Sequence, residues 1–151
     1  DWCAACKELD QHTYTSPSVV AEAERFVKVK VDGTDDHEIL DARAAPRFRG
    51  EADEPRAGLR KGHIPGSKNL PFTELMNDDG TLKSPDALRA LFAAKGIDLG
   101  KPVITSCGSG VTAANINLAL ERIGHSNHAL YDGSWAEWGA FPTLPVATGD
   151  A

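Results

Sequence analysis

The sequence has no long apolar run, no excess of basic residues and few cysteines. None of its apolar runs approaches the roughly 20 residues of a membrane-spanning helix, so we expect no membrane partner. Its 16 Lys and Arg residues against 22 Asp and Glu residues give a net charge of −6, which argues against a nucleic-acid partner. Three cysteines allow at most one disulfide, so at least one thiol stays free.

The length and composition are those of an ordinary globular protein. At 151 residues the chain suits one domain, or one domain and a fragment, and it is long enough to need no disulfide staples. Its 41% hydrophobic and 25% charged residues are typical of soluble proteins. The chain begins at Asp1 rather than at a methionine, so we expect it to be processed or trimmed.

One stretch of the chain predicts a strand, a tight loop and a helix in direct succession. Residues 103–105 are apolar and β-branched, as in a buried strand, and residues 111–120 are rich in Ala and Leu at helical spacing. Between them lies Cys107, followed closely by Gly108 and Gly110, which let the backbone turn without a Cβ in the way. The sequence therefore places a cysteine at the start of a glycine-rich loop that leads into a helix.

This position favours a reactive thiol. The loop aims backbone N–H groups and the positive end of a helix dipole at one point, and these donors should lower the pKa of Cys107. The alternative is a buried, inert cysteine beside a tight turn. An arginine six residues after the cysteine would indicate phosphoryl chemistry, but that position is Ala113 and the loop has no cation.

The loop Cys107-Gly-Ser-Gly-Val-Thr112 closely resembles the active-site loop of the 3-mercaptopyruvate sulfurtransferases, in the rhodanese superfamily. The resemblance implies that Cys107 is the nucleophile that carries a persulfide and that Ser109 relays protons. In the family that relay also uses an Asp and a His of a preceding inactive domain, which we expect to be absent here. Residues 108, 110, 111 and 112 would then form the cradle of the persulfide. The uncharged loop points to mercaptopyruvate as the sulfur donor rather than thiosulfate.

Three further segments carry the same resemblance. Arg47 and Arg56 match a pair that holds the carboxylate and carbonyl of the donor, for which the planar fork of arginine is well suited; the alternative is two solvated arginines in a mobile loop. Residues 58–71 form a second signature, in which we interpret His63 as structural. Residues 132–139 form a third, in which Trp135 would wall the active site while Trp138 packs in the core. The strand-end pair Asp41 and Arg43 is interpreted as a structural salt bridge.

The fold class implied is α/β, a rhodanese-like parallel sheet flanked by helices, because strands alternate with helical patterns. We assign residues 37–148 to this rhodanese domain and residues 149–151 to a loose tail, with residues from 142 onward also expected to be loose. No metal or cofactor is expected.

The first 36 residues resemble a different protein family. The motif Trp2-Cys3-Ala-Ala-Cys6 and the alternating run of residues 26–32 resemble part of the thioredoxin-like domain of DsbD-type thiol:disulfide interchange proteins. Cys3 and Cys6 are therefore candidate redox cysteines in a thioredoxin-like helix and strand, a partial domain. The alternative is a pair of inherited cysteines packed on the sheet. A joint between two unrelated families suggests an engineered or recombined chimera.

The resulting functional hypothesis is a sulfurtransferase. Sulfur would pass from a small-molecule donor, 3-mercaptopyruvate or thiosulfate, through a Cys107 persulfide to cyanide or a thiol acceptor such as thioredoxin. The alternatives are a thiol-disulfide redox protein that uses Cys3 and Cys6, a module that carries sulfur with little turnover, and a fused device in which these cysteines discharge the persulfide. The family resemblance favours the cytoplasm, whereas the DsbD-like segment points to the periplasm.

Overall fold

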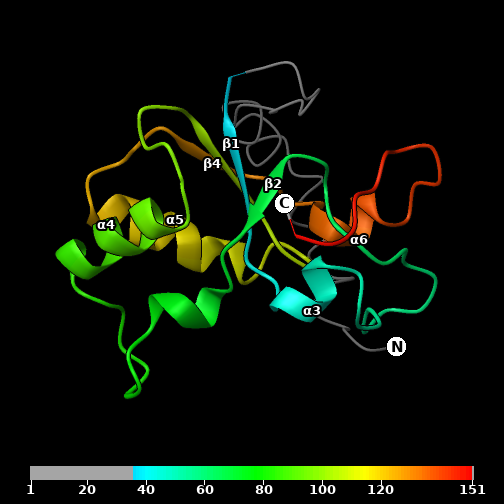
Figure 1. Ribbon diagram of the computed structural model, residues 1–151, viewed down its shortest axis with the longest axis horizontal. Helices are drawn as coiled ribbons and strands as arrows, with labels where there is room; N and C mark the ends of the chain where they lie inside the picture. The colour runs from blue at the N-terminus through cyan, green and yellow to red at the C-terminus, as the bar shows by residue number, and fades with distance from the viewer. Residues whose placement is uncertain (1–35, 151) are drawn as a thin grey trace, which may run out of the picture. The chain divides into compact units, whose positions relative to one another are not determined.

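The computed structural model describes residues 36–150, and within them the strands form one parallel sheet. The four strands are β1 (Glu38–Asp41), β2 (Ser67–Asn69), β3 (Val103–Ser106) and β4 (His128–Leu130). Their order is β2-β1-β3-β4, so β1 and β3 are the central pair (Figure 1). The pairing aligns Asp41 with Ser106 and Thr105 with Leu130, which brings the carboxyl ends of the strands to one edge of the sheet.

Helices lie on both faces of this sheet (Figure 1). On one side are the 3-10 helix η2 (Phe72–Leu75) and the longer helices α4 (Pro85–Ala94) and α5 (Ala113–Arg122). On the other side are the short helices α3 (Ala45–Phe48) and α6 (Ser134–Trp138). The predicted α/β class, a parallel sheet flanked by helices, is confirmed. The thioredoxin-like segment predicted over residues 1–36 lies outside the described residues apart from Asp36.

The larger hydrophobic cluster fills the space between the sheet and helices α4 and α5. Leu88 and Phe92 of α4 and Ile116 and Leu120 of α5 are fully buried there against β-strand residues such as Val103. A smaller cluster on the other face contains Ile39, Ile64 and Trp135. Both faces of the central strands are therefore covered, as a parallel sheet requires.

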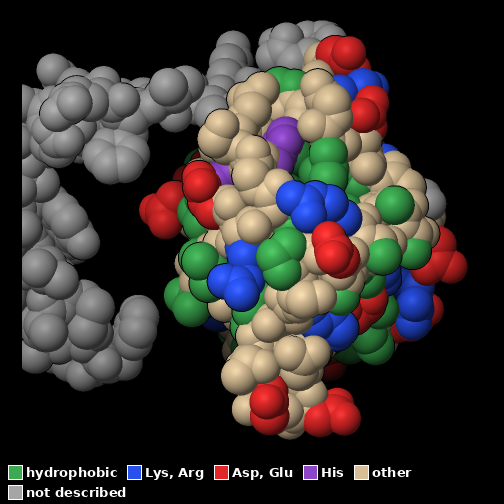
Figure 2. Space-filling model, turned by 90° about the vertical axis from the view of Figure 1, so that its left-hand side faces the viewer, with side chains coloured by type: hydrophobic (Ala, Val, Ile, Leu, Met, Phe, Trp, Pro, Cys, Tyr) green, Lys and Arg blue, Asp and Glu red, His purple; other side chains and the backbone are tan. Residues whose placement is uncertain are grey.

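The ends of α4 follow from local sequence signals. Ser84 caps its first turn by accepting a hydrogen bond from the Ala87 backbone N–H at 3.3 Å, and Pro85 occupies the first helical position. Gly96 follows with a φ of 66°, in the left-handed region that closes a helix. Figure 2 shows the molecule from the α4 side, where hydrophobic, acidic and basic side chains are intermixed. Among the described residues no helix is long and apolar enough to cross a membrane.

Two strands differ slightly from the prediction. The sequence predicts strands at residues 69–70 and 129–131, whereas the observed strands are Ser67–Asn69 and His128–Leu130. The inter-strand hydrogen bonds nevertheless continue to the expected ends, because the Leu70 N–H donates to Asp41 O and the Tyr131 N–H to Thr105 O, both at 2.9 Å. The difference is therefore one of residue boundaries and leaves the pairing intact.

The prediction that the chain is loose from residue 142 is wrong for residues 142–148, while the loose tail assigned to residues 149–151 stays a prediction. His63 and Ala147 exchange backbone hydrogen bonds of 2.8 and 3.0 Å, and the Gly149 N–H donates to Arg49 O at 3.0 Å. The Trp138 indole N–H donates to Pro145 O at 2.7 Å. Proline and threonine content suggested looseness, but backbone pairing with residues distant in the chain holds this segment.

Candidate functional site

Cys107 lies at the carboxyl end of the central strand β3, with a side chain that is almost completely buried. The loop of residues 108–112 turns around its sulfur before α5 begins at Ala113. Gly110 has a φ of 82°, and a Cβ there would lie 3.1 Å from both Asp132 O and Asp132 Oδ1. The tight turn thus needs a glycine at this position, both for its backbone angle and for the close approach of Asp132.

The sulfur of Cys107 receives hydrogen bonds from the loop around it. The Ser109 N–H donates to Sγ at 3.4 Å. Burial raises the pKa of the thiol, but hydrogen bonds from the Thr112 hydroxyl and from the backbone N–H groups of Ser109, Ala113 and Thr112 outweigh it and lower the pKa overall. The sequence-based expectation of a lowered thiol pKa is confirmed. This cysteine is free, which suits a nucleophile.

Hydrogen bonds with the first residues of α6 hold the cysteine loop in place. The Cys107 N–H donates to Ser134 Oγ at 3.1 Å, and the Ser134 hydroxyl donates to Tyr131 O at 2.8 Å. The Trp135 N–H donates to Cys107 O and the Ala136 N–H to Gly108 O, both at 2.9 Å. Ser134 is fully buried and has a φ of 49°, the one positive φ outside glycine among residues 36–150. A side chain in this backbone region is strained, and its hydrogen bonds offset that strain.

A pocket of about 220 Å³ opens over Cys107. Its walls come from the 107–112 loop, from α3 and from the segment that follows α3. The lining residues are Arg47, Glu54, Pro55, Arg56, Leu59, Cys107, Gly108, Ser109, Val111 and Thr112. The structure therefore brings both predicted arginines to the cysteine, although Arg47 lies 60 residues and Arg56 lies 51 residues before it in the chain.

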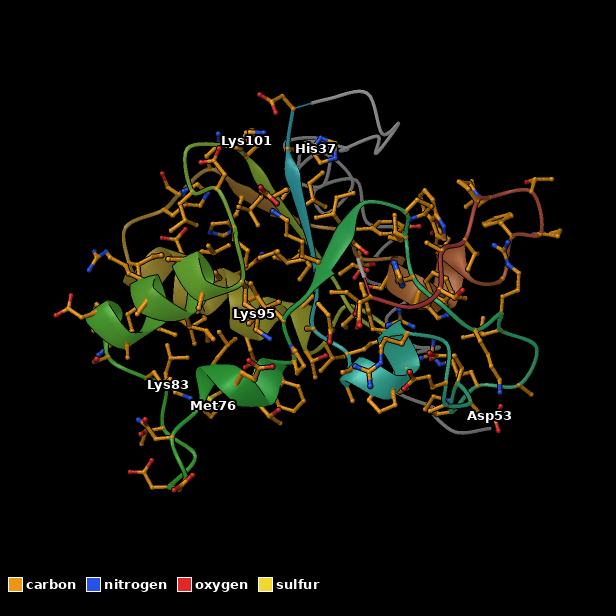
Figure 3. All side chains as sticks on the ribbon, viewed as in Figure 1. His37, Asp53, Met76, Lys83, Lys95 and Lys101 are labelled. Carbon is orange, nitrogen blue, oxygen red and sulfur yellow. The ribbon has the colours of Figure 1, made fainter. Side chains whose placement is uncertain are left out.

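An ion pair holds the segment that carries Arg56. Lys61 Nζ lies 2.6 Å from Asp53 Oδ1, and this ion pair lowers the pKa of the Asp53 carboxyl group. In Figure 3 Asp53 lies on the α3 side of the sheet, far from Lys83 and Lys95 on the α4 side. His37 and Lys101 in the same view precede β1 and β3, at the amino ends of the strands and opposite the pocket.

Arg47 lies against the cysteine loop and is held by Glu54. Its Nη2 lies 2.5 Å from Glu54 Oε2 and its Nε 3.3 Å from Glu54 Oε1. A Cβ on Gly108 would come within 2.9 Å of Arg47 Nη2, so the absence of a side chain at position 108 leaves room for the guanidinium. Arg47 is 27% exposed, whereas the Glu54 side chain is 2% exposed.

Glu54 is also bound from behind by Arg43. Arg43 Nη1 donates to Glu54 Oε1 at 2.8 Å, and Arg43 Nη2 donates to Asp41 Oδ2 at 2.7 Å and to Gly62 O at 2.8 Å. The interpretation of Asp41 and Arg43 as a structural salt bridge is confirmed, because both side chains are buried and join the strand end to two loops.

His63 is likewise structural: it is buried, bonded through Nδ1 to Phe48 O at 2.8 Å and stacked on the Phe48 ring.

The prediction for Trp135 needs correction. Its side chain is fully buried in the smaller hydrophobic cluster and does not line the pocket. The indole N–H donates to Arg60 O at 2.8 Å, and the guanidinium of Arg43 lies 4.5 Å above the ring. Trp135 therefore supports the buried ion pairs behind the pocket, while Trp138, expected in the core, is only partly buried.

Two residues of the site were missed by the sequence reasoning. Glu54 lies between Arg47 and Arg56 in the sequence, and an acidic residue between two arginines of one site was the available signal. Ser134 gave no signal, because its role depends on a backbone angle and on contacts with Cys107. The candidate redox residues Cys3 and Cys6 lie outside the described residues. Within residues 36–150, no group of His, Cys, Asp or Glu side chains is arranged to hold a metal ion.

Comparison with known proteins gives a consistent result. The profile of the rhodanese-like domain matches residues 25–141, a range that begins inside the segment of the DsbD-type resemblance. The chain is 56% identical over 109 residues to 3-mercaptopyruvate sulfurtransferase of Escherichia coli (strain K12), covering 72% of this chain and 38% of that protein. It is 50% identical over 102 residues to thiosulfate sulfurtransferase of Bos taurus, covering 67% and 34%.

Among solved structures, the Tum1 protein from Saccharomyces cerevisiae matches with a TM-score of 0.68 and 36% identity, over 76% of this chain and 41% of that one. The chain thus spans between a third and about two-fifths of the length of these relatives.

Proposed function

Since the chain belongs to the rhodanese-like domain family, we propose that it transfers sulfur from 3-mercaptopyruvate through a persulfide on Cys107. The observation that carries the proposal is the Cys107 sulfur, surrounded by hydrogen-bond donors at the base of a pocket that also holds Arg56. The names of relatives at 48–56% identity support this donor.

The first half-reaction is a displacement at sulfur. The Cys107 thiolate attacks the sulfur atom of 3-mercaptopyruvate, forming an S–S bond while the C–S bond of the donor breaks. The electron pair leaves on carbon as the enolate of pyruvate, which takes up the proton that the donor thiol gives up. The lowered pKa of Cys107 supplies the thiolate, and the loop N–H groups stabilise the persulfide anion that forms.

The donor would be oriented by the arginines. Arg56 is exposed at the pocket and can hold the carboxylate of the donor, while Arg47, already engaged by Glu54, reaches its carbonyl. Ser109 lines the pocket beside Cys107, and its exposed hydroxyl is placed to pass a proton between donor and solvent. These roles explain why the two segments meet at the cysteine.

The second half-reaction returns the free cysteine. A thiol acceptor such as thioredoxin attacks the outer sulfur of the persulfide, and the Cys107 thiolate leaves. Cyanide takes the same sulfur as thiocyanate. The pocket opens to solvent at Val111, which is 74% exposed, so an acceptor thiol can approach.

The test is pyruvate release from 3-mercaptopyruvate together with the intact mass of the chain after exposure to donor alone. We expect one added sulfur and one pyruvate per chain before acceptor is added, and continuous pyruvate release with a thiol present. Cys107→Ser should show neither. Absence of both the sulfur adduct and pyruvate in the parent chain would contradict the proposal.

For residues 1–36 we propose an origin in a DsbD-type thioredoxin-like domain joined to the rhodanese domain as a chimera. The motif Trp2-Cys3-Ala-Ala-Cys6 supports it. If these cysteines discharge the persulfide within the same molecule, replacing both Cys3 and Cys6 by serine should abolish acceptor-free sulfide release. An unchanged rate would contradict that coupling.

A further inference from the structure

The charges of four side chains around the pocket cancel one another: Asp41, Arg43, Arg47 and Glu54. One further cation lies outside this set. Glu54 lies between two guanidinium groups, Arg47 at the pocket and Arg43 behind it, and Arg43 is in turn paired with Asp41. Two carboxylates therefore face two guanidinium groups within hydrogen-bond distance. The side chains of Asp41, Arg43 and Glu54 are at most 2% exposed, so water screens these charges little.

Arg56 is the cation that stands outside this set. It lines the same pocket and is exposed, and among the described residues it has no salt-bridge partner. The pocket-facing charge is thus +1 from Arg56, because the +1 of Arg47 is cancelled by Glu54. Without Glu54 the same walls would carry two uncompensated cations.

Glu54 also occupies the hydrogen-bonding edge of Arg47. Both Nε and Nη2 of Arg47 donate to Glu54, so one of the two edges by which a guanidinium can grip a carboxylate is already taken. Arg47 offers a ligand its three remaining N–H groups, on Nη1 and Nη2, and these can donate to the carbonyl oxygen of a donor. The negative charge of Glu54 and the hydrogen bonds that it accepts from Arg47 therefore both weaken the grip of Arg47 on an anionic donor.

We propose that Glu54 is a specificity-determining residue, which neutralises Arg47 and so matches the pocket to a singly charged sulfur donor over a doubly charged one. The choice of donors rests on the proposed function. An α-keto acid thiol carries one negative charge and one carbonyl oxygen, which Arg56 and Arg47 match. Thiosulfate carries two negative charges and would be favoured by two free arginines.

The electrostatic part can be tested without any sulfur transfer, by alkylating Cys107 with iodoacetate, an anion, and iodoacetamide, a neutral reagent of similar size. Because both reagents attack the same thiolate, the ratio of their rates reports the potential at Cys107 and is insensitive to its pKa. A small neutral thiol, 2-mercaptoethanol, supplies the reference ratio. We expect the parent chain to favour iodoacetate relative to that reference at low salt, and the preference to fall as salt is added.

Two substitutions should move this ratio in opposite directions. Glu54→Gln should raise the preference for iodoacetate by about two- to fivefold, the scale of one unit charge acting across a partly solvated pocket. Arg56→Gln should lower the preference and its salt dependence, because the remaining charged side chains balance one another and only the hydrogen-bond donors of the loop are left to attract the anion. Glu51→Gln is the matched control: Glu51 is exposed, pairs with Arg49 and does not line the pocket, so the ratio should stay unchanged.

Two results would overturn the inference. A folded Glu54→Gln chain with an unchanged ratio would show that Glu54 does not set the potential. If that variant does not fold, Arg56→Gln decides alone: a preference for iodoacetate at low salt as large in Arg56→Gln as in the parent chain would mean that Arg47 is not neutralised.

The proposed preference between the two sulfur donors is measured as kcat/KM for thiosulfate divided by kcat/KM for 3-mercaptopyruvate. Glu54→Gln should raise this quotient by about two- to fivefold, on the same electrostatic scale, and an unchanged or lower quotient would contradict the assignment of specificity. If the parent chain transfers sulfur from neither donor, the proposed function fails, while the alkylation ratios still decide the role of Glu54.

Discussion

The guanidinium of Arg47 fills the space where a side chain at Gly108 would begin, with Nη2 only 2.9 Å from that Cβ position. The two residues are brought together because Glu54 holds Arg47 against the loop. A side chain in the first loop position would therefore displace the end of Arg47. The absence of a side chain after the cysteine thus has a steric reason in this pocket.

Gly108→Ala should consequently weaken donor binding. The added methyl group displaces the end of Arg47, and we expect kcat/KM for 3-mercaptopyruvate to fall roughly tenfold, about 1.4 kcal/mol, mainly through KM. Steady-state kinetics measure this. Gly100→Ala is a control, because its Cβ would meet only the flexible Asp98 side chain, at 3.0 Å. Equal KM values in the parent and Gly108→Ala would contradict the steric argument.

Thr112→Val should make the cysteine less reactive at neutral pH. Among the hydrogen bonds to Cys107, that of the Thr112 hydroxyl lowers the thiol pKa most, so its loss should move that pKa upward. The pH profile of alkylation by iodoacetamide should then shift to higher pH, with a slower rate at pH 7. Thr73→Val, at an exposed site away from the pocket, should leave the profile unchanged. A profile in Thr112→Val identical to that of the parent would refute this.

The lowered pKa of Cys107 should also appear in the stability of the fold. Hydrogen bonds lower the pKa in the folded chain, whereas the unfolded thiol has its ordinary value of 9.0. The unfolded state then binds more protons between these two values, so the free energy of unfolding should rise with pH across that window. Urea denaturation of the parent and of Cys107→Ser measures the effect. The serine variant should lack this rise, and parallel curves for the two proteins would contradict the linkage.

Arg43 should matter for stability more than any exposed arginine. Arg43→Met leaves the buried carboxylates of Asp41 and Glu54 without their shared partner, and breaking such a buried pair typically costs about 3–5 kcal/mol. Chemical denaturation measures the loss. Arg49→Met, which breaks an exposed pair with Glu51, should change stability little. Similar losses in the two variants would show that the buried set contributes no more than a surface pair.

Local sequence signals predicted the parts of the site that depend on neighbouring residues. The β-branched run 103–105, the cysteine and the glycines at 108 and 110 indicate a strand, a tight loop and a helix, and the structure has all three. The ends of α4 likewise follow from local signals, at Ser84, Pro85 and Gly96. In each case the physical cause lies within a few residues of its effect.

The parts that were missed depend on how the chain folds back on itself. Glu54 pairs with Arg47 because a loop folds back onto α3, and the acidic residue between two arginines was a signal that the sequence reasoning did not use. Trp135 was expected at the pocket, but α6 turns its side chain inward beneath Arg43. The tail looked loose because its composition is poor in structure-forming residues, while its order comes from backbone bonds to His63 and Arg49.

Ser134 allows the backbone and the hydrogen-bond contributions to loop stability to be separated. Ser134→Ala leaves the buried Cys107 N–H without its acceptor, a loss of about 1–3 kcal/mol, and retains the strained φ of 49°. Ser134→Gly loses the same acceptor but relieves the strain, since glycine adopts this region freely.

The glycine variant should therefore be more stable than the alanine variant by about 1 kcal/mol. Both should alkylate Cys107 more slowly than the parent, because Ser134 positions the backbone that surrounds the sulfur. Denaturation curves and alkylation rates of the three proteins give both quantities. If Ser134→Gly were the less stable of the two, the hydrogen bonds alone would account for the role of Ser134, and its backbone angle would carry no strain.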